Sequence, residues 1–306
     1  MDWRVKAIAQ NVFSHLPKGR QFNYMFQEHV TRSNHLDEAR FLDILSWGTS
    51  HLEAIRRHES RPLQQLTFYE FGAGYHLVGP LTFFSYGVSR QLLVDLEPLL
   101  RTNLINESVA SFQKFGAKLG LPRLPGSTID SEDLVTSLRK LYGIEYRAPG
   151  DARATGLPPD SVDCITSTST LEHIDPGDIG AILRECHRIL RADGIMSMSV
   201  DYADHYAFFD NSISEYNFLR YSDRAWKMFN PRLHFQNRLR HADYVRLFEA
   251  SGFEIIEERR REGSPQDVEG LRRMSVAKRF AKYRLVDLAI RGAYFVLRRA
   301  KSTNRS

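Results

Sequence analysis

The chain is poor in cysteine and has no long hydrophobic run. Only Cys164 and Cys186 occur among its 306 residues, which argues against a disulfide framework or a metal site. No stretch approaches the roughly 20 apolar residues of a membrane-spanning helix, and the first residues open no apolar run of secretory length. These absences predict a cytoplasmic protein in a reducing compartment, with both cysteines as small buried hydrophobic residues.

Acidic residues are scarce relative to basic ones near the end of the chain. The formal net charge is only +5, but residues 256–306 contain 14 Lys or Arg against 6 Asp or Glu. Such an excess can attract phosphate, acidic polysaccharide or an anionic membrane surface; a solvated basic face is the simpler interpretation. The length and the 42% hydrophobic content indicate one large α/β domain with additions.

A glycine is missing where a dinucleotide site would need one. In TFYEFGAGY, residues 67–75, an apolar strand runs into Glu70 and then into Gly72 and Gly74. Dinucleotide sites continue to a third glycine, as G-x-G-x-x-G, but Leu77 stands at that position. Two glycines still allow a tight turn and close contact between backbone and ligand, which predicts a nucleotide site of another kind.

A second acidic residue follows about twenty residues later. The apolar segment Leu92-Leu93-Val94 ends at Asp95, whose carboxylate can accept hydrogen bonds from both hydroxyls of a ribose. The carboxyl ends of neighbouring parallel strands meet at one crevice in open α/β sheets. We therefore expect Asp95 and the glycine turn to lie side by side.

The rest of the chain alternates predicted strands and helices, which indicates a parallel sheet with helices on both faces. Asp175-Pro176 predicts a helix start, a buried stripe follows, and Gly194 is expected to end this helix. A basic helix is expected at 272–284. The further strands are expected at 144–147, 162–167, 195–200, 253–257 and 293–297.

In their order these segments resemble the class I S-adenosylmethionine (SAM) methyltransferases of the methyltransferase type 11-like group. The resemblance spans about residues 64–260 and departs from the family at His76, where many members have a small residue. It implies SAM as the cofactor. The cofactor-binding residues it implies are Glu70, Gly72, Ala73 and Gly74 in the loop, Asp95 at the ribose, Asp151 and Ala152 at the adenine, and Thr168.

The resemblance also implies a fold and a division of the chain. The fold is a Rossmann-like, seven-stranded, mostly parallel sheet with an antiparallel edge strand. An N-terminal helical cap is expected over residues 1–62, because such a piece commonly covers the cofactor crevice in this family. Residues 63–306 would form the SAM-binding domain, with a basic helical insertion near 265–288.

Catalytic groups are expected in the loop after the fifth predicted strand, Asp201-Tyr202-Ala203-Asp204-His205. An imidazole beside a carboxylate is a plausible general base, so His205 and Asp204 are the first candidates. His173 joins them because the family places this position near the methyl-transfer site. Two carboxylates and a histidine can also bind a metal, but no second ligand cluster accompanies them in the sequence, and no metal is expected.

Two further side chains are predicted to bind the methyl acceptor. Tyr202 lies in the same loop as His205. Arg238, or Arg240 beside it, offers a guanidinium that can grip a carboxylate or phosphate through two hydrogen bonds. The acceptor is expected to be a small molecule or saccharide, methylated on oxygen or nitrogen.

Three other functions stay open from the sequence. A nicotinamide-dependent oxidoreductase would share the crevice, but it needs the third glycine and often a Tyr-x-x-x-Lys pair, which the core lacks. An RNA methyltransferase would fit the basic C-terminal region, but the fourth strand leads into Ser167-Thr168-Ser169-Thr170 rather than an Asn-Pro-Pro-Tyr-like motif. No nucleic-acid partner is therefore expected. The third alternative is a SAM-binding fold without catalysis.

Overall fold

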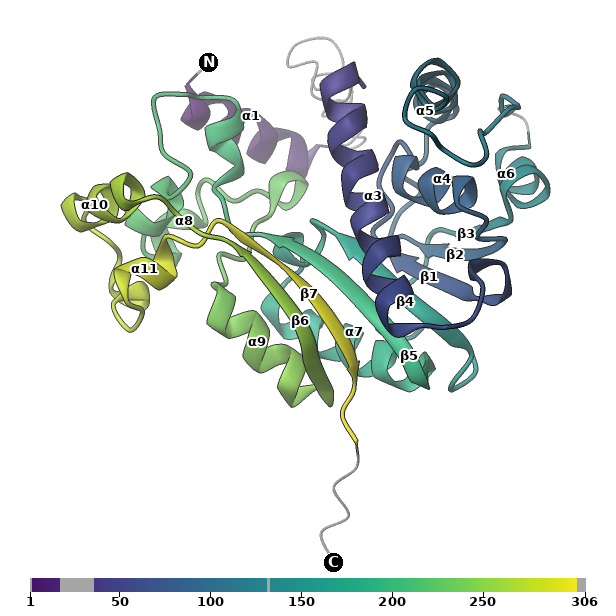
Figure 1. The fold of residues 1–306 in the computed structure, drawn as a ribbon. Coiled ribbons are helices and arrows are strands. Elements are labelled where there is room, and N and C mark those ends of the chain that lie inside the picture. Colours follow the sequence, from purple (N-terminus) through teal and green to yellow (C-terminus); the bar gives the residue numbers. More distant parts are fainter. Residues whose placement is uncertain (1, 17–35, 131–132, 302–306) are drawn as a thin grey trace, which may run out of the picture.

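The computed structural model describes residues 2–16, 36–130 and 133–301. These residues form a seven-stranded sheet of order β3-β2-β1-β4-β5-β7-β6 (Figure 1). All neighbours from β3 to β5 pair in parallel, and β7 pairs antiparallel with both β5 and the edge strand β6, which confirms the predicted fold class. The strands are β1 (Thr67–Phe71), β2 (Arg90–Val94), β3 (Ile144–Arg147), β4 (Val162–Thr168), β5 (Leu190–Asp201), β6 (Phe253–Arg261) and β7 (Gly292–Arg299).

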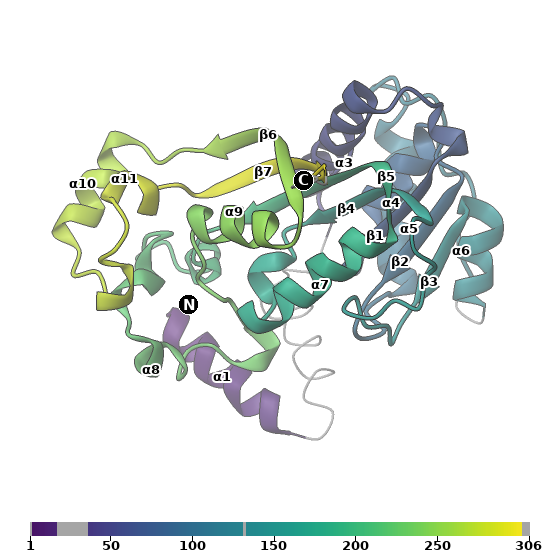
Figure 2. The same cartoon turned by 90° about the horizontal axis from the view of Figure 1, so that it is seen from below.

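Helices cover both faces of the sheet (Figure 2). One face carries α3 (Glu38–His58), α4 (Val78–Ser85), α5 (Thr102–Phe115) and α6 (Leu134–Tyr142). The other face carries α7 (Pro176–Ile189) and α9 (His241–Ala250), whose apolar side chains pack against the buried face of β4, β5 and β7. Both cysteines are free and buried, as predicted.

A satellite cluster of aromatic and aliphatic residues lies beside the sheet. Trp3 is at its centre, with ring centroids 4.8 Å from Phe229 and 5.4 Å from Tyr206. Such rings bury large apolar surfaces. Their packing therefore holds α1 against Tyr206 and Phe229, which lie more than two hundred residues away in the sequence. The elements of the cluster are α1 (Trp3–His15), η3 (His205–Phe208), η4 (Asn217–Arg220), α8 (Asp223–Trp226), α10 (Pro265–Arg273), η6 (Lys278–Phe280) and α11 (Leu285–Leu288).

Helix α7 begins as its sequence predicts and ends earlier than predicted. The Asp175 carboxylate accepts a hydrogen bond from the Gly177 N–H at 2.9 Å, which satisfies one of the free donors of the first turn. The helix ends at Ile189, and β5 begins at Leu190. Gly194 therefore lies within the strand, where an added Cβ would come 2.8 Å from the Asp163 carbonyl oxygen; it permits close strand contact rather than ending a helix.

The predicted basic helix at 272–284 is also misplaced. The insertion between β6 and β7 instead holds α10, which begins after Ser264 and ends at Arg273, a short turn of 3-10 helix at Lys278–Phe280, and the short helix α11 at Leu285–Leu288. Ser264 and Asp267 form a reciprocal capping box, which fixes the start of the helix well before the basic run.

The two described helices of the predicted N-terminal cap pack in different parts of the protein. Helix α3 packs against α4 and β5 on one face of the sheet, whereas α1 belongs to the satellite cluster. Residues 17–35 of the predicted cap lie outside the described residues. The domain boundary at residues 62 and 63 therefore stays a prediction.

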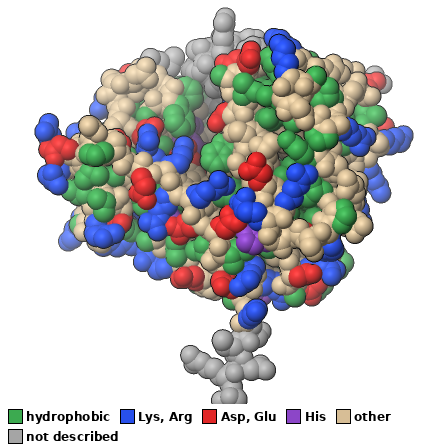
Figure 3. All heavy atoms as spheres, in the orientation of Figure 1, with side chains coloured by type: hydrophobic (Ala, Val, Ile, Leu, Met, Phe, Trp, Pro, Cys, Tyr) green, Lys and Arg blue, Asp and Glu red, His purple; other side chains and the backbone are tan. Residues whose placement is uncertain are grey.

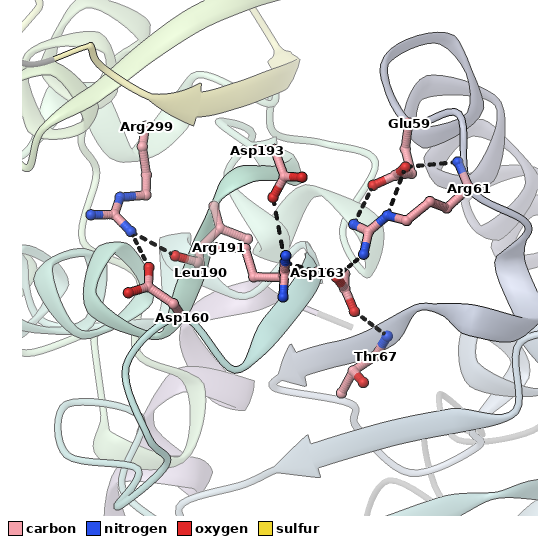
Figure 4. A network of polar contacts seen from close by, with 9 residues as sticks. All are labelled: Glu59, Arg61, Thr67, Asp160, Asp163, Leu190, Arg191, Asp193 and Arg299. Carbon is pink, nitrogen blue, oxygen red and sulfur yellow. Dashed lines mark hydrogen bonds and ion pairs between the residues drawn. The ribbon is translucent and has the colours of Figure 1, made fainter.

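The amino-terminal ends of the central strands are held by ionic contacts (Figure 4). Asp163, at the start of β4, accepts a hydrogen bond from the Thr67 N–H at 2.8 Å and pairs with Arg61 at 2.8 Å. Arg191 bridges Asp163 and Asp193, and Arg299 pairs with Asp160 while donating to the Leu190 carbonyl. The carboxylates at this end of the sheet therefore have arginine partners.

Basic and acidic side chains are interspersed on the surface shown in Figure 3. The arginines near the C-terminus mostly have acidic partners: Arg260 with Glu258, Arg261 with Asp201, Arg272 and Arg273 with Glu269, Arg279 with Asp223, Arg284 with Asp287, Arg298 with Glu254 and Arg299 with Asp160. Contact with an anionic surface stays a prediction. In the part of the chain that the structure describes, no helix combines the length and apolar character that crossing a bilayer requires.

Candidate active site

The glycine turn after β1 forms one wall of the site. Gly72 has φ +76° and Gly74 has φ +74°, a region that favours glycine. A Cβ on Gly72 would lie 2.3 Å from Cγ2 of Thr170, whereas one on Gly74 would meet nothing within 4 Å. Gly72 is therefore required for close packing of two strand ends, whereas the space beside the Gly74 Cα is open.

Asp95 lies directly after β2 and beside this turn, as predicted. It is 4% exposed, and its Oδ2 atom has no hydrogen-bond partner. Burial raises the pKa of Asp95 to about 6, against the opposing effect of the Tyr146 hydroxyl and the Ala73 N–H. A buried carboxylate oxygen without a donor is costly, and the two hydroxyls of a ribose would supply donors. The residues present thus fit the adenosine part of SAM.

A cavity of about 590 Å³ opens above Asp95, a size suited to a small organic ligand. Its apolar lining includes Phe71, Val94, Leu96, Leu99, Ile174 and Ile182, and its polar lining includes Asp95, Asp151, Arg153, Thr170 and His173. Ala152 also lines it. The Asp151 carboxylate is paired with Arg153 at 2.8 Å, and Arg153 pairs with Asp178 at 2.7 Å, so this wall is braced by an ionic bridge.

One side of the cavity is built from elements distant in sequence. Arg232 and Leu233 of η5 (Arg232–His234) line it, and α1 packs against η5. The N-terminal helix therefore supports a wall of the crevice indirectly.

The residues that line the cavity do not include four of the predicted cofactor-binding residues: Glu70, Ala73, Gly74 and Thr168. Thr168 at the end of β4 shares a hydrogen bond with His51 Nε2 at 3.0 Å. Glu70 is buried beneath the glycine turn, and its Oε2 atom has no partner. Burial, and then the negative charge of Asp95, raises the pKa of Glu70 to about 8. Their roles in cofactor binding stay predictions.

We expect Glu70→Gln to remove a pH dependence of folding. Between the ordinary value of 4.5 and about 8, the folded protein keeps a proton that the unfolded chain has released, so stability falls as pH rises through this window. The variant lacks this titration and should gain stability relative to the parent, on the order of 2 kcal/mol, between about pH 5 and about pH 8. Urea unfolding of both proteins at the two pH values measures the difference. If the stability difference between the variant and the parent is the same at both pH values, the raised pKa of Glu70 is contradicted.

Histidines and carboxylates gather at the other end of the crevice. His173 lines the cavity, and its Nδ1 lies 2.8 Å from the Phe235 carbonyl oxygen. The centroids of the His173 and His205 rings are 4.9 Å apart. Desolvation, and then the proximity of His205, lowers the pKa of His173, so its ring is neutral near pH 7.

Asp201 and Glu172 complete this cluster. Asp201 Oδ2 lies 3.7 Å from His205 Nε2, and its Oδ1 accepts a hydrogen bond from Arg261 at 2.9 Å. Glu172 is 3% exposed, and one of its oxygens accepts a hydrogen bond from the Asp201 N–H at 3.3 Å. Burial, and then the charge of Asp201, raises the pKa of Glu172 well above its usual range. The predicted pairing of His205 with a carboxylate thus involves Asp201.

The Asp204 carboxylate is held by hydrogen bonds inside the protein. It is fully buried, and it accepts hydrogen bonds from the Tyr206 N–H and the Asn217 side chain, each at 3.0 Å. It caps the turn η3. A catalytic role for Asp204 beside His205 stays a prediction.

Tyr202 and Arg238 also lie away from the cavity lining. Tyr202 is buried and stacks on Tyr244 with centroids 5.4 Å apart. Arg238 donates to the Phe218 and Tyr221 carbonyls and to Asp223, each at 2.7 Å. These donors of Arg238 are directed to groups inside the protein, and the predicted roles of Tyr202 and Arg238 in acceptor binding stay predictions.

Tyr146 and Glu172 lie at the site but are not among the residues predicted from the sequence to bind or react. Tyr146 lies on β3, next to β2 in the sheet, and reaches Asp95 across the strands. The pairing of β2 with β3 could have suggested this neighbour. Glu172 joins the histidines only because the ends of β4 and β5 are adjacent.

Solved methyltransferase structures resemble the chain at low identity. The 1,6-didemethyltoxoflavin-N1-methyltransferase of Burkholderia thailandensis has a TM-score of 0.48 and 13% identity, covering 92% of this chain and 87% of its own. A putative sarcosine dimethylglycine methyltransferase from Galdieria sulphuraria has a TM-score of 0.44 and 17% identity, covering 85% and 86% respectively. A putative SAM-dependent methyltransferase from Listeria monocytogenes has a TM-score of 0.44 and 13% identity, covering 84% and 100%.

No curated protein matches the chain. Residues 128–198 match the family model described as a methyltransferase domain. This segment includes β3, β4, α7 and the first part of β5, which surround the crevice. This match, the strand order and the adenosine-compatible crevice at Asp95 are consistent with a class I SAM-dependent methyltransferase.

Proposed function

We propose that the protein methylates an oxygen or nitrogen of a small-molecule or sugar acceptor. One observation carries the proposal: a single cavity extends from the unpartnered carboxylate of Asp95 to the ring of His173. A cofactor anchored by its ribose at the first end would leave its reactive group directed toward the second. The donor and the acceptor would then be held in one enclosed space, where proximity and orientation accelerate transfer.

The cofactor end provides binding and positioning. Bound SAM supplies a methyl group on a positively charged sulfur. Asp95 would accept the ribose hydrogen bonds, and the turn at Gly72 and Gly74 would let the backbone approach the ligand. Ala152 and the bridge of Asp151 to Arg153 bound the opposite wall, at the position predicted for the adenine.

The histidine end provides activation of the acceptor. A hydroxyl or protonated amine has to release its proton as its heteroatom attacks. His173 is exposed to the crevice and neutral near pH 7, and His205 lies against it. The hydrogen bond between His173 Nδ1 and the Phe235 carbonyl assigns the proton to Nδ1, which leaves the Nε2 lone pair for the acceptor side.

We expect His205→Ala to lower turnover about 100-fold or more. The affinity for SAM should change by less than about twofold, because His205 does not line the adenosine end of the cavity. Turnover is measured as release of S-adenosylhomocysteine with a panel of phenols, sugars and amines, and affinity by calorimetric titration with SAM. His187→Gln, which changes a histidine of α7 that packs against Phe253, serves as the control. Equal turnover in the parent and His205→Ala would remove His205 from the reaction, and no SAM binding by the parent would refute the proposed function.

A further inference from the structure

We infer that Glu172, His173 and His205 bind a divalent transition-metal ion at the acceptor end of the crevice. One carboxylate oxygen and one ring nitrogen from each histidine lie within 4.8 Å of one another. The inference rests on the proposed function, because it names how the same end of the cavity would activate the acceptor. It adds a cofactor that the sequence does not predict.

Two polar atoms of the cluster have no hydrogen-bond partner in the protein. Glu172 is 3% exposed, its Oε2 atom has no hydrogen-bond partner, and the buried Nε2 atom of His205 has none either. Buried polar atoms are nearly always satisfied. Two unsatisfied atoms in adjoining side chains therefore require a common explanation, and one cation between them would supply it.

The orientation of His173 supports the same assignment. Its Nδ1 lies 2.8 Å from the Phe235 carbonyl oxygen. Histidine ligands commonly donate their other ring N–H to a carbonyl or carboxylate, which fixes the tautomer and directs a lone pair to the metal. The Asp201 N–H similarly orients Glu172 at 3.3 Å. Asp201 Oδ2, at 3.7 Å from His205 Nε2, is a neighbouring carboxylate that can orient a bound water.

The donor set indicates the class of metal. Two imidazoles and one carboxylate suit Zn²⁺, Fe²⁺ or Mn²⁺ better than Mg²⁺ or Ca²⁺, which prefer oxygen ligands. Ligands about 2.1 Å from a tetrahedral ion lie about 3.4 Å apart, so the side chains have to close in from separations of up to 4.8 Å.

An ion at this position would leave coordination sites facing the cavity, since His173 is part of the cavity lining. With the ion bound, the Nε2 lone pair of His173 would be a ligand and not a base. An acceptor hydroxyl on the ion would instead release its proton to the water of the crevice, because the cation stabilises the resulting oxygen anion. Acceptors with two adjacent oxygen atoms, such as the vicinal diol of a sugar, would fill two such positions.

Metal binding by the whole protein tests the inference without measuring activity. After treatment with EDTA and removal of the chelator, the protein is titrated calorimetrically with ZnCl₂ or MnCl₂. We expect one ion per chain, and about tenfold or greater weakening in His173→Gln, His205→Gln and Glu172→Gln. The control His187→Gln should bind as the parent does. If Glu172→Gln unfolds at the temperature of the titration, His173→Gln carries the same test, because its ring faces the open cavity.

Absence of binding by the parent overturns the inference, and so does equal affinity in the parent and all three cluster variants. A parallel titration with SAM in EDTA separates this result from the proposed function. SAM binding and turnover without any metal affinity would leave the methyltransferase intact and refute the metal site alone.

Discussion

Replacement of Asp95 by alanine is expected to weaken SAM binding about 100-fold. The carboxylate is the buried acceptor at the ribose end of the crevice, and hydrogen bonds to a charged group contribute about 1.5–3 kcal/mol each. Two such bonds are offset in part because the variant no longer buries a carboxylate with an unpartnered oxygen. A net loss of about 3 kcal/mol corresponds to two orders of magnitude in the dissociation constant.

Calorimetric titration with SAM measures this loss, and Asp193→Asn is a matched control. Asp193 is an exposed carboxylate at the opposite end of the sheet; its replacement should leave the dissociation constant within about twofold of the parent value. Thermal unfolding of both variants verifies that they are folded. Unchanged affinity in a folded Asp95→Ala protein would show that the ribose is bound elsewhere.

Replacement of Arg240 by alanine should destabilise the protein by about 3–5 kcal/mol. This guanidinium is 1% exposed and donates hydrogen bonds to the carbonyl oxygens of Tyr202, Leu288 and Ile290 at 2.7–2.8 Å. Its removal leaves three buried acceptors unsatisfied, and each carries a desolvation cost. Arg240→Lys should restore only part of the stability, because an ammonium group cannot reproduce the planar fork.

The free energy of unfolding in urea gives the result, with Arg246→Ala as the control. Arg246 lies on the same helix, α9, but its side chain is 61% exposed and paired with Asp243 at 2.5 Å. A pair of this kind contributes at most about 1 kcal/mol. Similar losses in Arg240→Ala and Arg246→Ala would show that the three carbonyls are satisfied by water when the guanidinium is absent.

The contacts of Arg238 and Arg240 could not be predicted from the sequence. Arg238 and Arg240 were interpreted as donors for a ligand, because a guanidinium in a polar segment is typical of anion recognition. In the structure their donors go to carbonyls on segments that are far away in sequence or in irregular loops. No local pattern reveals which backbone acceptors will lack a partner in the folded protein.

The sheet and the cofactor end were more accessible to prediction. A strand that ends in two glycines and a strand that ends in an acid are local patterns, and parallel pairing brings their ends together. Asp95, Gly72 and Gly74 were therefore identified correctly as neighbours. The cluster of Glu172, His173 and His205 depends on side chains from two strand ends about thirty residues apart, and their mutual distances follow only from tertiary structure.

The two ends of this sheet differ in how their buried carboxylates are partnered. At the amino-terminal end, Asp163 has its charge matched by arginines; at the carboxyl-terminal end, Glu70, Asp95 and Glu172 each keep an oxygen without a donor. Several of the buried oxygens that lack a donor therefore lie beside the crevice, where a ligand can supply one. Ligand binding would satisfy some of these groups, so occupancy and resistance to unfolding should rise together.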